Sequence, residues 1–433
     1  MRIFLLVCVM TLAAAAAGAQ APRREPLLGV GSDPVQPPAP VAANASAPFF
    51  DDTVLQEVRL DINSKDWETL KENFLSNAYY PADLRWRGET VRNVGIRSRG
   101  NASRSGTKPG LRVDFNRYSA NQTFLGLKSF VLRNNTTDAT SLRERVSMLV
   151  FRRMGVPAPR EAHARLYVNS SYAGLYSMVE SVDKTFLANV YGEGGQDGYL
   201  YGFERNLGDV PYHFEYSGPE PERYVPHPFK PETHESDSRP ERIVEMVRTV
   251  AEASQAIFRS AIAGLVDVEQ WVRYVAVEMF LGDNDGFLGG SGMNNFYLYR
   301  PHVEARHVLI PWDKSEATLN GSGYSVLHTL RSVPESERNR LMVRLMASED
   351  LRSLYFDTLV ACAAMAMEPA TEDGRGWLER EVDRELQQIR DALHEDPAKP
   401  FTDVQIAEAA EALVKFAQDR PGFVINEVDS LRD

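Results

Sequence analysis

Three side chains between Leu281 and Leu319 have the types and the order that a metal-dependent phosphoryl-transfer site requires. Asp285 comes first, Asn295 second and Asp313 third. A carboxylate can accept the proton of a substrate hydroxyl, whereas an amide oxygen and a second carboxylate are hard oxygen ligands suited to Mg²⁺. The order therefore predicts Asp285 as the base, with Asn295 and Asp313 as metal ligands.

The local sequence also predicts the element that brings two of these side chains together. Residues 295–299 and 305–310 are two β-rich runs with a turn-like segment between them, and the second run leads into Pro311, Trp312 and Asp313. In a hairpin, the residue entering the first strand and the residue leaving the second lie at the same end. We therefore expect the side-chain oxygens of Asn295 and Asp313 to lie roughly 4 to 5 Å apart, as two ligands of one metal ion would.

Protein kinases present an Asp, an Asn and a metal-binding Asp in this order, with a hairpin between the last two. This chain has neither the HRD nor the DFG motif of kinases, and the gap between Asp285 and Asn295 is longer than a kinase catalytic loop. Each residue also has a purely structural interpretation: Asp285 can cap a turn, Asn295 can begin a strand and Asp313 can end one. The order of the three residues favours a site.

The same stretch resembles the CotH kinase-like family, named for a spore-coat protein. Its members carry an N-W-D-G-type loop, an NN-aromatic-Tyr-Leu-Tyr run and a P-W-D-x-D motif, to which residues 283–286, 294–299 and 311–315 are similar. Asn284 stands at the place of the usual Trp, which should be harmless. Ser315 stands where many relatives have a second Asp, a change expected to weaken metal binding.

Further segments at residues 94–115, 132–138 and 166–184 extend the resemblance over roughly residues 55 to 320. The resemblance implies an α+β class protein with a diverged, two-lobed protein-kinase-like fold, which has a β-rich N-terminal lobe and a helical C-terminal lobe. It also implies ATP with Mg²⁺ or Mn²⁺, and phosphorylation of secreted or surface proteins. Glu180, in the last of these segments, is implied as a nucleotide-binding residue.

The net charge of −12 argues against a nucleic acid or an anionic membrane as partner. ATP is also a polyanion, so an acidic protein that binds it must supply local positive charge. A basic cluster is the expected source, and its members are Arg97, Arg99, Arg104, Lys108 and Arg112. We expect Arg97, Arg99 and Lys108 to reach the phosphates; the alternative is a solvated strand face. In either case Lys108 should contribute little to the stability of the free protein.

The N-terminal residues predict export. Residues 1–19 contain an apolar run and end in Ala17-Gly18-Ala19, the form that signal peptidase accepts. Residues 20–52 are rich in Pro and Ala and predict a flexible linker. No later segment is long enough to span a bilayer, so we expect a secreted, periplasmic or cell-surface protein without a transmembrane segment after cleavage.

The expected kinase-like domain covers residues 53–330, and a helical extension of its C-terminal lobe follows at 331–433. A helix is predicted from Thr140 to about Met154, with Ser141 and Glu144 as a capping box. Pairing of Glu144 with a nucleotide-binding lysine, as in kinases, is the alternative. Another helix, capped by Asp267, should end at Gly282 and deliver the loop that carries Asp285.

Three classes of function stay open. An exported protein kinase is the leading hypothesis, and a catalytically inactive kinase-like surface or binding protein is the second, favoured by Ser315 and by the scarcity of ATP outside cells. A hydrolase is the third; the chain has no G-x-S-x-G motif, although a carboxylate-pair glycosidase stays open. Nucleotide-dependent thermal stabilisation would separate the first two from the hydrolase, and phosphate transfer would separate the first from the second.

Overall fold

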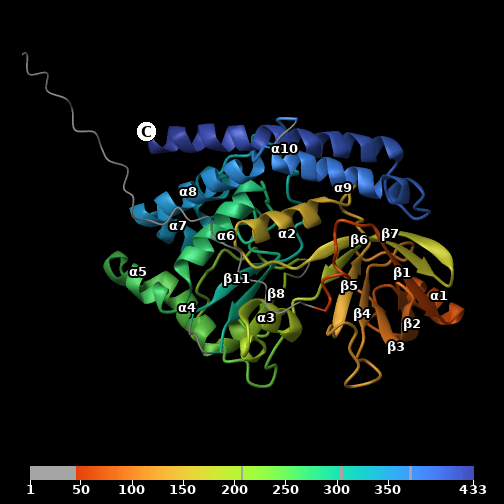
Figure 1. Ribbon diagram of the computed structural model, residues 1–433. Helices are drawn as coiled ribbons and strands as arrows, with labels where there is room; N and C mark the ends of the chain where they lie inside the picture. The colour runs from red at the N-terminus through yellow and green to blue at the C-terminus, as the bar shows by residue number, and fades with distance from the viewer. Residues whose placement is uncertain (1–44, 206–207, 303–305, 370–372) are drawn as a thin grey trace, which may run out of the picture. The chain divides into compact units, whose positions relative to one another are not determined.

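The computed structural model describes residues 45–205, 208–302, 306–369 and 373–433 (Figure 1). The predicted signal peptide and the predicted linker up to residue 44 lie outside the described residues. The rest of that linker is packed, because Phe49 is fully buried against Trp86, Phe124 and Phe130. The folded part of the chain therefore begins before residue 53, and Phe49 supplies apolar surface to its core.

The N-terminal half is built on a closed seven-stranded barrel with the strand order β1-β2-β3-β4-β5-β7-β6. Strands β1 and β6 pair in parallel and the other neighbours are antiparallel. Along β1, Val58, Leu60 and Ile62 alternate with more exposed residues and point into the barrel, where side chains fill the interior. The strands are β1 (Gln56–Ile62), β2 (Tyr80–Trp86), β3 (Glu89–Ser98), β4 (Leu111–Asp114), β5 (Ser129–Arg133), β6 (Glu161–Val168) and β7 (Ser171–Glu180).

A four-stranded antiparallel sheet with the order β11-β10-β8-β9 follows the barrel in the chain. Its strands are β8 (Tyr199–Phe203), β9 (Phe229–Pro231), β10 (Phe296–Arg300) and β11 (Val308–Pro311). The predicted hairpin is confirmed, since Phe296 pairs with Pro311 and Tyr299 pairs with Val308. The hairpin therefore does place residue 295 and residue 313 at the same end.

The α-helices among the described residues are α1 (Ser64–Glu72), α2 (Arg143–Arg153), α3 (Lys184–Tyr191), α4 (Glu241–Glu252), α5 (Gln255–Ala263), α6 (Val268–Phe280), α7 (Arg340–Met346), α8 (Glu349–Ala366), α9 (Trp377–His394) and α10 (Asp403–Arg432). In Figure 1, α9 lies over α2 and the part of the barrel formed by β6 and β7. None of the described helices is both long and apolar enough to cross a membrane. The protein is thus of the mixed α+β class, as predicted, and a two-lobed kinase-like arrangement stays a prediction.

Helix α6 lies in the core and leads to the predicted catalytic loop. Its N-cap is Asp267, as predicted, and the Asp267 carboxylate accepts a hydrogen bond from the Gln270 amide at 3.2 Å. The Gln270 side chain does not complete a capping box. It exchanges two hydrogen bonds with the Leu309 backbone, at 2.7 and 3.0 Å, and so fastens α6 to strand β11. The chain leaves α6 through Gly282, whose φ of 63° favours glycine.

Helix α2 does not begin with the predicted capping box. Its N-cap is Leu142, which makes no side-chain capping bond, and Ser141 has a left-handed φ of 59°. The free amides of the first turn bind upstream side chains instead: Asp138 accepts from the Arg143 amide at 2.8 Å and Thr140 from the Leu142 amide at 3.1 Å. Glu144 is thus not needed as a cap.

Helix α10 runs to Arg432 and contains Pro421 in its interior. Proline removes one backbone hydrogen bond, but Arg420 anchors the helix at this point. Its buried guanidinium donates to the carbonyl oxygens of Met279, Phe280, Ser322 and Tyr324, at distances of 2.5 to 2.8 Å. Helix α10 is therefore fixed to the C-terminal end of α6.

Substitution of Arg420 tests this anchor. Arg420→Met should lower the free energy of unfolding by about 2 to 5 kcal/mol, because four carbonyl oxygens lose charge-assisted hydrogen bonds. Denaturant unfolding measures the change. Arg432→Met on the same helix is the control, since the exposed pair of Arg432 with Asp357 should contribute at most about 1 kcal/mol. Equal effects of the two substitutions would show that Arg420 is no anchor.

Candidate functional site

One cavity of about 440 Å³ collects the three residues of the predicted site. Asp285, Asn295 and Asp313 all line it, together with Arg99 and Arg133. Further lining residues come from the loop after β3, the segment after β5 and the start of α2, and they include Asn101, Ser103, Asn134, Asn135, Asp138 and Glu144. Arg205 after β8, Asn294 before β10 and Glu316 after β11 also line the cavity. The tertiary structure thus brings the trio and part of the basic cluster to a single place.

Asp285 is held by the two asparagines that begin the hairpin. The Asn294 side chain donates to Asp285 Oδ1 at 3.1 Å, and Asn295 Nδ2 donates to Oδ2 at 2.7 Å and to the Asp285 carbonyl at 2.9 Å. Burial raises the pKa of Asp285; the Asn294 hydrogen bond opposes this, and nearby Asp283 adds to it. Since Asn295 uses its amide nitrogen here, its Oδ1 atom is the group left for another partner.

A buried ionic cluster lies beneath this loop. Lys314 Nζ lies 2.6 Å from Glu278 Oε1 and 2.9 Å from Asp283 Oδ2, and all three side chains are almost fully buried. The Glu278 carboxylate also accepts hydrogen bonds from the amides of Phe287 and Leu288, at 2.9 and 3.1 Å. The end of α6, the segment after β11 and both ends of the loop are therefore fixed to one point.

No local sequence pattern marks Lys314 or Glu278 as a functional residue. Lys314 directly follows Asp313, so one short segment supplies a carboxylate to the cavity and a cation to the cluster under the loop. Gly286 is part of the same arrangement, because a Cβ atom there would lie 2.0 Å from Glu278 Oε1. Only glycine allows the loop to pass this closely over the carboxylate.

Asp313 is bound by a cation and a hydroxyl. Arg133 lies 2.8 Å from Asp313 Oδ1, and the Ser315 hydroxyl donates to the same oxygen at 3.1 Å. Burial alone would raise the pKa of Asp313, but the charge and hydrogen bond of Arg133 lower it below its ordinary value. Asp313 is therefore a carboxylate at neutral pH, and its charge is shared with an arginine.

Arg133, at the end of β5, also pairs with Glu144 of α2, with Nε 2.7 Å from Oε2. The sequence-based alternative for Glu144 is pairing with a nucleotide-binding lysine. Glu144 does pair with a cation and not with the helix N-terminus, but the cation is Arg133. Burial raises the pKa of Glu144. Burial also raises the pKa of Glu161, another carboxylate near Arg133, to about 7. The sequence contained Arg133 within residues 132–138, but no local pattern marked it as a site residue.

The four predicted nucleotide-binding residues lie in different places. Arg99 lines the cavity with its guanidinium 5.6 Å from the centre of the Trp312 ring; burial and the charge of Arg133 lower its pKa to about 10. Arg97 lines a neighbouring cavity of about 520 Å³, which Arg99 also lines. The Arg97 guanidinium donates to Tyr79 at 3.1 Å and to Asn77 at 3.3 Å.

Lys108 and Glu180 line neither of these two cavities. Lys108 Nζ lies 2.6 Å from Asp396 Oδ2, and both side chains are buried. Glu180 is bound by the Arg160 guanidinium at 2.9 and 2.6 Å. Both charges are thus satisfied inside the protein, and the position of neither supports a role at the phosphates.

The donor set for a metal is small. Among the described residues, no group of three or more His, Cys, Asp or Glu side chains is placed to hold a metal ion. Asn295 and Asp313 supply two oxygen donors of the kind that Mg²⁺ prefers, and both line the same cavity. The residues present therefore fit such an ion in kind. The expected separation of their oxygens stays a prediction.

The fold and the cavity define an α+β protein with a polar site formed by carboxylates, asparagines and arginines. The chain belongs to the CotH kinase protein family, whose model matches residues 96–424. It is also 26% identical over 326 residues to inner spore coat protein H of Bacillus subtilis (strain 168), which covers 71% of this chain and 84% of that protein. The family match extends past residue 320 into α10, beyond the motifs recognised in the sequence.

The buried pair changes what we expect of Lys108. Lys108→Ala should lower the free energy of unfolding by about 3 to 5 kcal/mol, because it leaves the Asp396 charge buried without its partner. The sequence alone predicts almost no effect on stability. Nucleotide affinity, measured well below the melting temperature, should stay unchanged.

The double variant Lys108→Ala/Asp396→Asn is the control for this prediction. It should recover part of the lost stability, because the group left behind is no longer charged. An unchanged melting temperature together with weaker ATP binding would contradict the structural role of Lys108. Lys108 would then again be a candidate ligand of the phosphates.

Proposed function

We propose that this protein is an exported, atypical protein kinase that transfers the γ-phosphate of ATP to hydroxyl side chains of secreted or surface proteins. The observation that carries the proposal is the meeting of Asp285, Asn295 and Asp313 in one cavity, beside the cations Arg99 and Arg133. Phosphoryl transfer needs little covalent participation from the protein, so placement and charge are the main requirements.

In this proposal Asp285 accepts the proton of the substrate hydroxyl or orients that hydroxyl. Its raised pKa makes it a stronger base than an ordinary aspartate, and its hydrogen bonds to Asn294 and Asn295 fix its direction. Asn295 Oδ1 and the Asp313 carboxylate would hold Mg²⁺ or Mn²⁺. When bound, the ion would neutralise charge on the phosphates of ATP.

The arginines would supply the positive charge that an acidic protein otherwise lacks. Arg133 is fixed between Glu144 and Asp313, an arrangement similar to the Lys–Glu pair of protein kinases. Arg99 stacks near Trp312 and makes no ion pair within 4.0 Å among the described residues, so more of its charge is available to a phosphate. These two side chains are therefore the proposed phosphate ligands.

The neighbouring cavity of about 520 Å³ is the proposed place of the nucleoside. Arg99 belongs to both cavities, which links the nucleoside end to the phosphate end. Apolar and aromatic side chains in its wall offer faces for a base, and they are Val131, Val182, Phe203, Phe296, Tyr297 and Trp312.

Export of this protein is part of the proposal. It rests on the signal peptide predicted for residues 1–19 and on the relative whose name places it in the inner spore coat. The partners would then be ATP and a secreted or surface protein.

A second candidate is a catalytically inactive, kinase-like surface or binding protein. Two observations at the metal end favour it: Ser315 stands where many relatives have a second Asp, and Arg133 already contacts the Asp313 carboxylate. Incubation of purified residues 20–433 with labelled ATP, Mg²⁺ or Mn²⁺ and a panel of exported proteins separates the two. Labelled protein supports the kinase, whereas nucleotide-dependent stabilisation without any transfer supports the binding protein.

Substitution of the two aspartates should separate binding from chemistry. Asp313→Ala should abolish metal-dependent nucleotide binding. Asp285→Ala should retain nucleotide binding and lose on the order of 10²-fold or more in transfer rate. Calorimetric titration measures the first effect and single-turnover transfer the second; equal losses of nucleotide affinity in both variants would contradict the assigned roles.

The two arginines of the basic cluster should also differ. Arg99→Ala should weaken ATP binding by roughly 10-fold or more while barely changing adenosine binding, since only ATP presents phosphate charge. Arg97→Ala is the matched control, because the Arg97 guanidinium is already bonded to Tyr79 and Asn77. A larger loss of ATP affinity in the Arg97 variant would move the phosphate site into the neighbouring cavity.

A further inference from the structure

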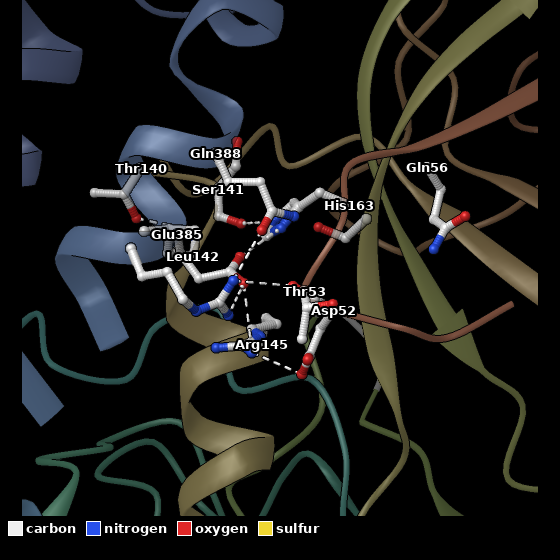
Figure 2. Close-up of polar contacts among 12 residues, drawn as sticks. Asp52, Thr53, Gln56, Thr140, Ser141, Leu142, Arg145, His163, Glu385 and Gln388 are labelled. Carbon is white, nitrogen blue, oxygen red and sulfur yellow. Dashed lines mark hydrogen bonds and ion pairs between the residues drawn. The ribbon is translucent and has the colours of Figure 1, made fainter. Parts of the chain in front are cut away.

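A buried charged cluster fixes the side of α2 that faces α9 (Figure 2). Its first member is Arg145, which directly follows the cavity residue Glu144 and is only 1% exposed. The Arg145 guanidinium lies 2.6 Å from Asp52 Oδ2, contacts Glu381, and lies 3.4 Å from Glu385 Oε1. The start of the folded chain, α2 and α9 therefore meet at one guanidinium.

His163 of β6 lies at the centre of the cluster and is also 1% exposed. Its Nδ1 atom lies 3.0 Å from Glu385 Oε2, and its Nε2 atom lies 2.7 Å from the carbonyl oxygen of Ser141. A backbone carbonyl and an ionised carboxylate can only accept hydrogen bonds. Both ring nitrogens must then donate, so the geometry requires His163 to be an imidazolium cation.

The surrounding charges are consistent with this protonation state. Charged groups of α2, α9, β6 and the segment before β1 surround the His163–Glu385 pair. Arg145 and Arg384 act on Glu385, Glu161 acts on His163, and Asp52 and Glu381 bind Arg145. Burial alone would raise the pKa of Glu385, but the hydrogen bond from His163 and the charges of His163, Arg145 and Arg384 lower it to about 2. Burial alone would lower the pKa of His163, and Glu385 and the Ser141 carbonyl raise it.

The Ser141 carbonyl is important because of its place in the chain. Ser141 has a φ of 59°, a conformation that costs a serine free energy and that its surroundings must maintain. Helix α2 starts two residues later, and Glu144 of its first turn reaches Arg133 in the cavity. A hydrogen bond to Ser141 therefore acts on the turn that places Glu144.

We propose that α9 is a positioning element of the nucleotide site. The imidazolium of His163, bound between Glu385 of α9 and the Ser141 carbonyl, holds the first turn of α2 so that Glu144 meets Arg133 beside Asp313. Glu385 and His163 are positioning residues, which act on the phosphates of ATP only through Glu144 and Arg133. This inference rests on the proposed function as far as ATP is concerned, whereas the positioning of α2 is independent of it.

If the cluster had a purely structural role, its substitution would be expected to give a different result. Helix α9 also meets the barrel through Tyr172, whose hydroxyl donates to the Ala392 carbonyl at 2.7 Å, and through the pair of Arg165 with Glu395. If the cluster served only to attach α9, its loss would lower stability and leave nucleotide affinity unchanged at temperatures well below melting. Positioning requires that nucleotide affinity also falls.

The variant Glu385→Gln tests the proposal, and Glu427→Gln is its matched control. Glu427 of α10 accepts hydrogen bonds from Ser325 Oγ at 2.5 Å and from the Val326 amide at 2.9 Å, and it lines neither cavity. Glu385→Gln should weaken ATP binding on the order of 10-fold to 10²-fold, because a small shift of Glu144 misplaces Arg133. Adenosine binding in this variant and ATP binding in Glu427→Gln should match those of the unsubstituted protein.

The pH dependence of stability provides a further readout, with a defined sign. Because the folded-state pKa of His163 is raised above 6.5, its contribution is complete below that unfolded-state value and is lost as the pH rises through the folded-state pKa. The stability difference between the unsubstituted protein and His163→Asn should therefore shrink on the alkaline side. The contribution of Glu385 runs the other way and is lost only as the pH falls towards about 2.

Two measurements keep the test independent of nucleotide binding and of the folding of any single variant. In the unsubstituted protein, ¹⁵N NMR of His163 should show both ring nitrogens protonated at neutral pH. Hydrogen exchange of the first turn of α2 should be faster in Glu385→Gln and unchanged in Glu427→Gln. If the unsubstituted protein binds no nucleotide, the proposed function fails while these two readouts still decide the positioning. The positioning proposal would be overturned by a neutral His163 ring. It would also be overturned if Glu385→Gln changed neither the hydrogen exchange of α2 nor the affinity for ATP.

Discussion

The ion pairs of Lys314 with Glu278 and Asp283 are the interaction on which the candidate site depends. A lysine that is fully buried must have its charge balanced, and two carboxylates at 2.6 and 2.9 Å provide this balance. Although burial alone would lower the pKa of Lys314, the two carboxylates raise it well above the ordinary lysine value, so the cation persists at neutral pH. Glu278 belongs to α6, Asp283 begins the loop of Asp285, and Lys314 follows Asp313. One cluster therefore sets the relative position of the proposed base and of a proposed metal ligand.

A second electrostatic constraint concerns the two arginines that line the cavity. The chain is acidic overall, yet Arg99 and Arg133 both line the cavity, and both guanidinium groups lie near the Trp312 ring. Arg133 is retained there by Glu144 and Asp313, while Arg99 is retained by its place beside Trp312. The charge of the cavity can thus differ from the net charge of the protein. The electrostatic potential in a partly desolvated cavity is set mainly by the few nearest charged groups. A polyanion can be attracted to these two arginines although the net charge of the protein is negative.

The C-terminal helices take part in both constraints. Arg420 of α10 binds the carbonyl oxygens at the end of α6, immediately before the loop of Asp285. Glu385 of α9 is linked through His163 to the Ser141 carbonyl, directly before the first turn of α2. Asp396, in the segment between α9 and α10, buries the charge of Lys108 near the barrel. The extension is therefore part of the structure that shapes the cavity, in accord with a family match that continues to residue 424.

The sequence by itself determined the features that depend on neighbours along the chain. The order of Asp285, Asn295 and Asp313, the hairpin between the last two and the Asp267 cap all follow from local patterns, because strand pairing and helix capping are decided within a few residues. The family was recognised from several motifs in order along the chain, and the mixed α+β class followed from that resemblance.

Only the tertiary structure decided the partner of each buried charge. Lys108 pairs with a carboxylate 288 positions away, and Arg420 binds a carbonyl 140 positions away. Glu144 looked like a cap because a capping box is a local pattern, yet it pairs with Arg133 once the end of β5 is folded beside α2. Sequence patterns indicate the periodicity and the ends of helices and strands. The free energy of burying a charged side chain depends instead on which groups, often distant in the sequence, replace the water around it.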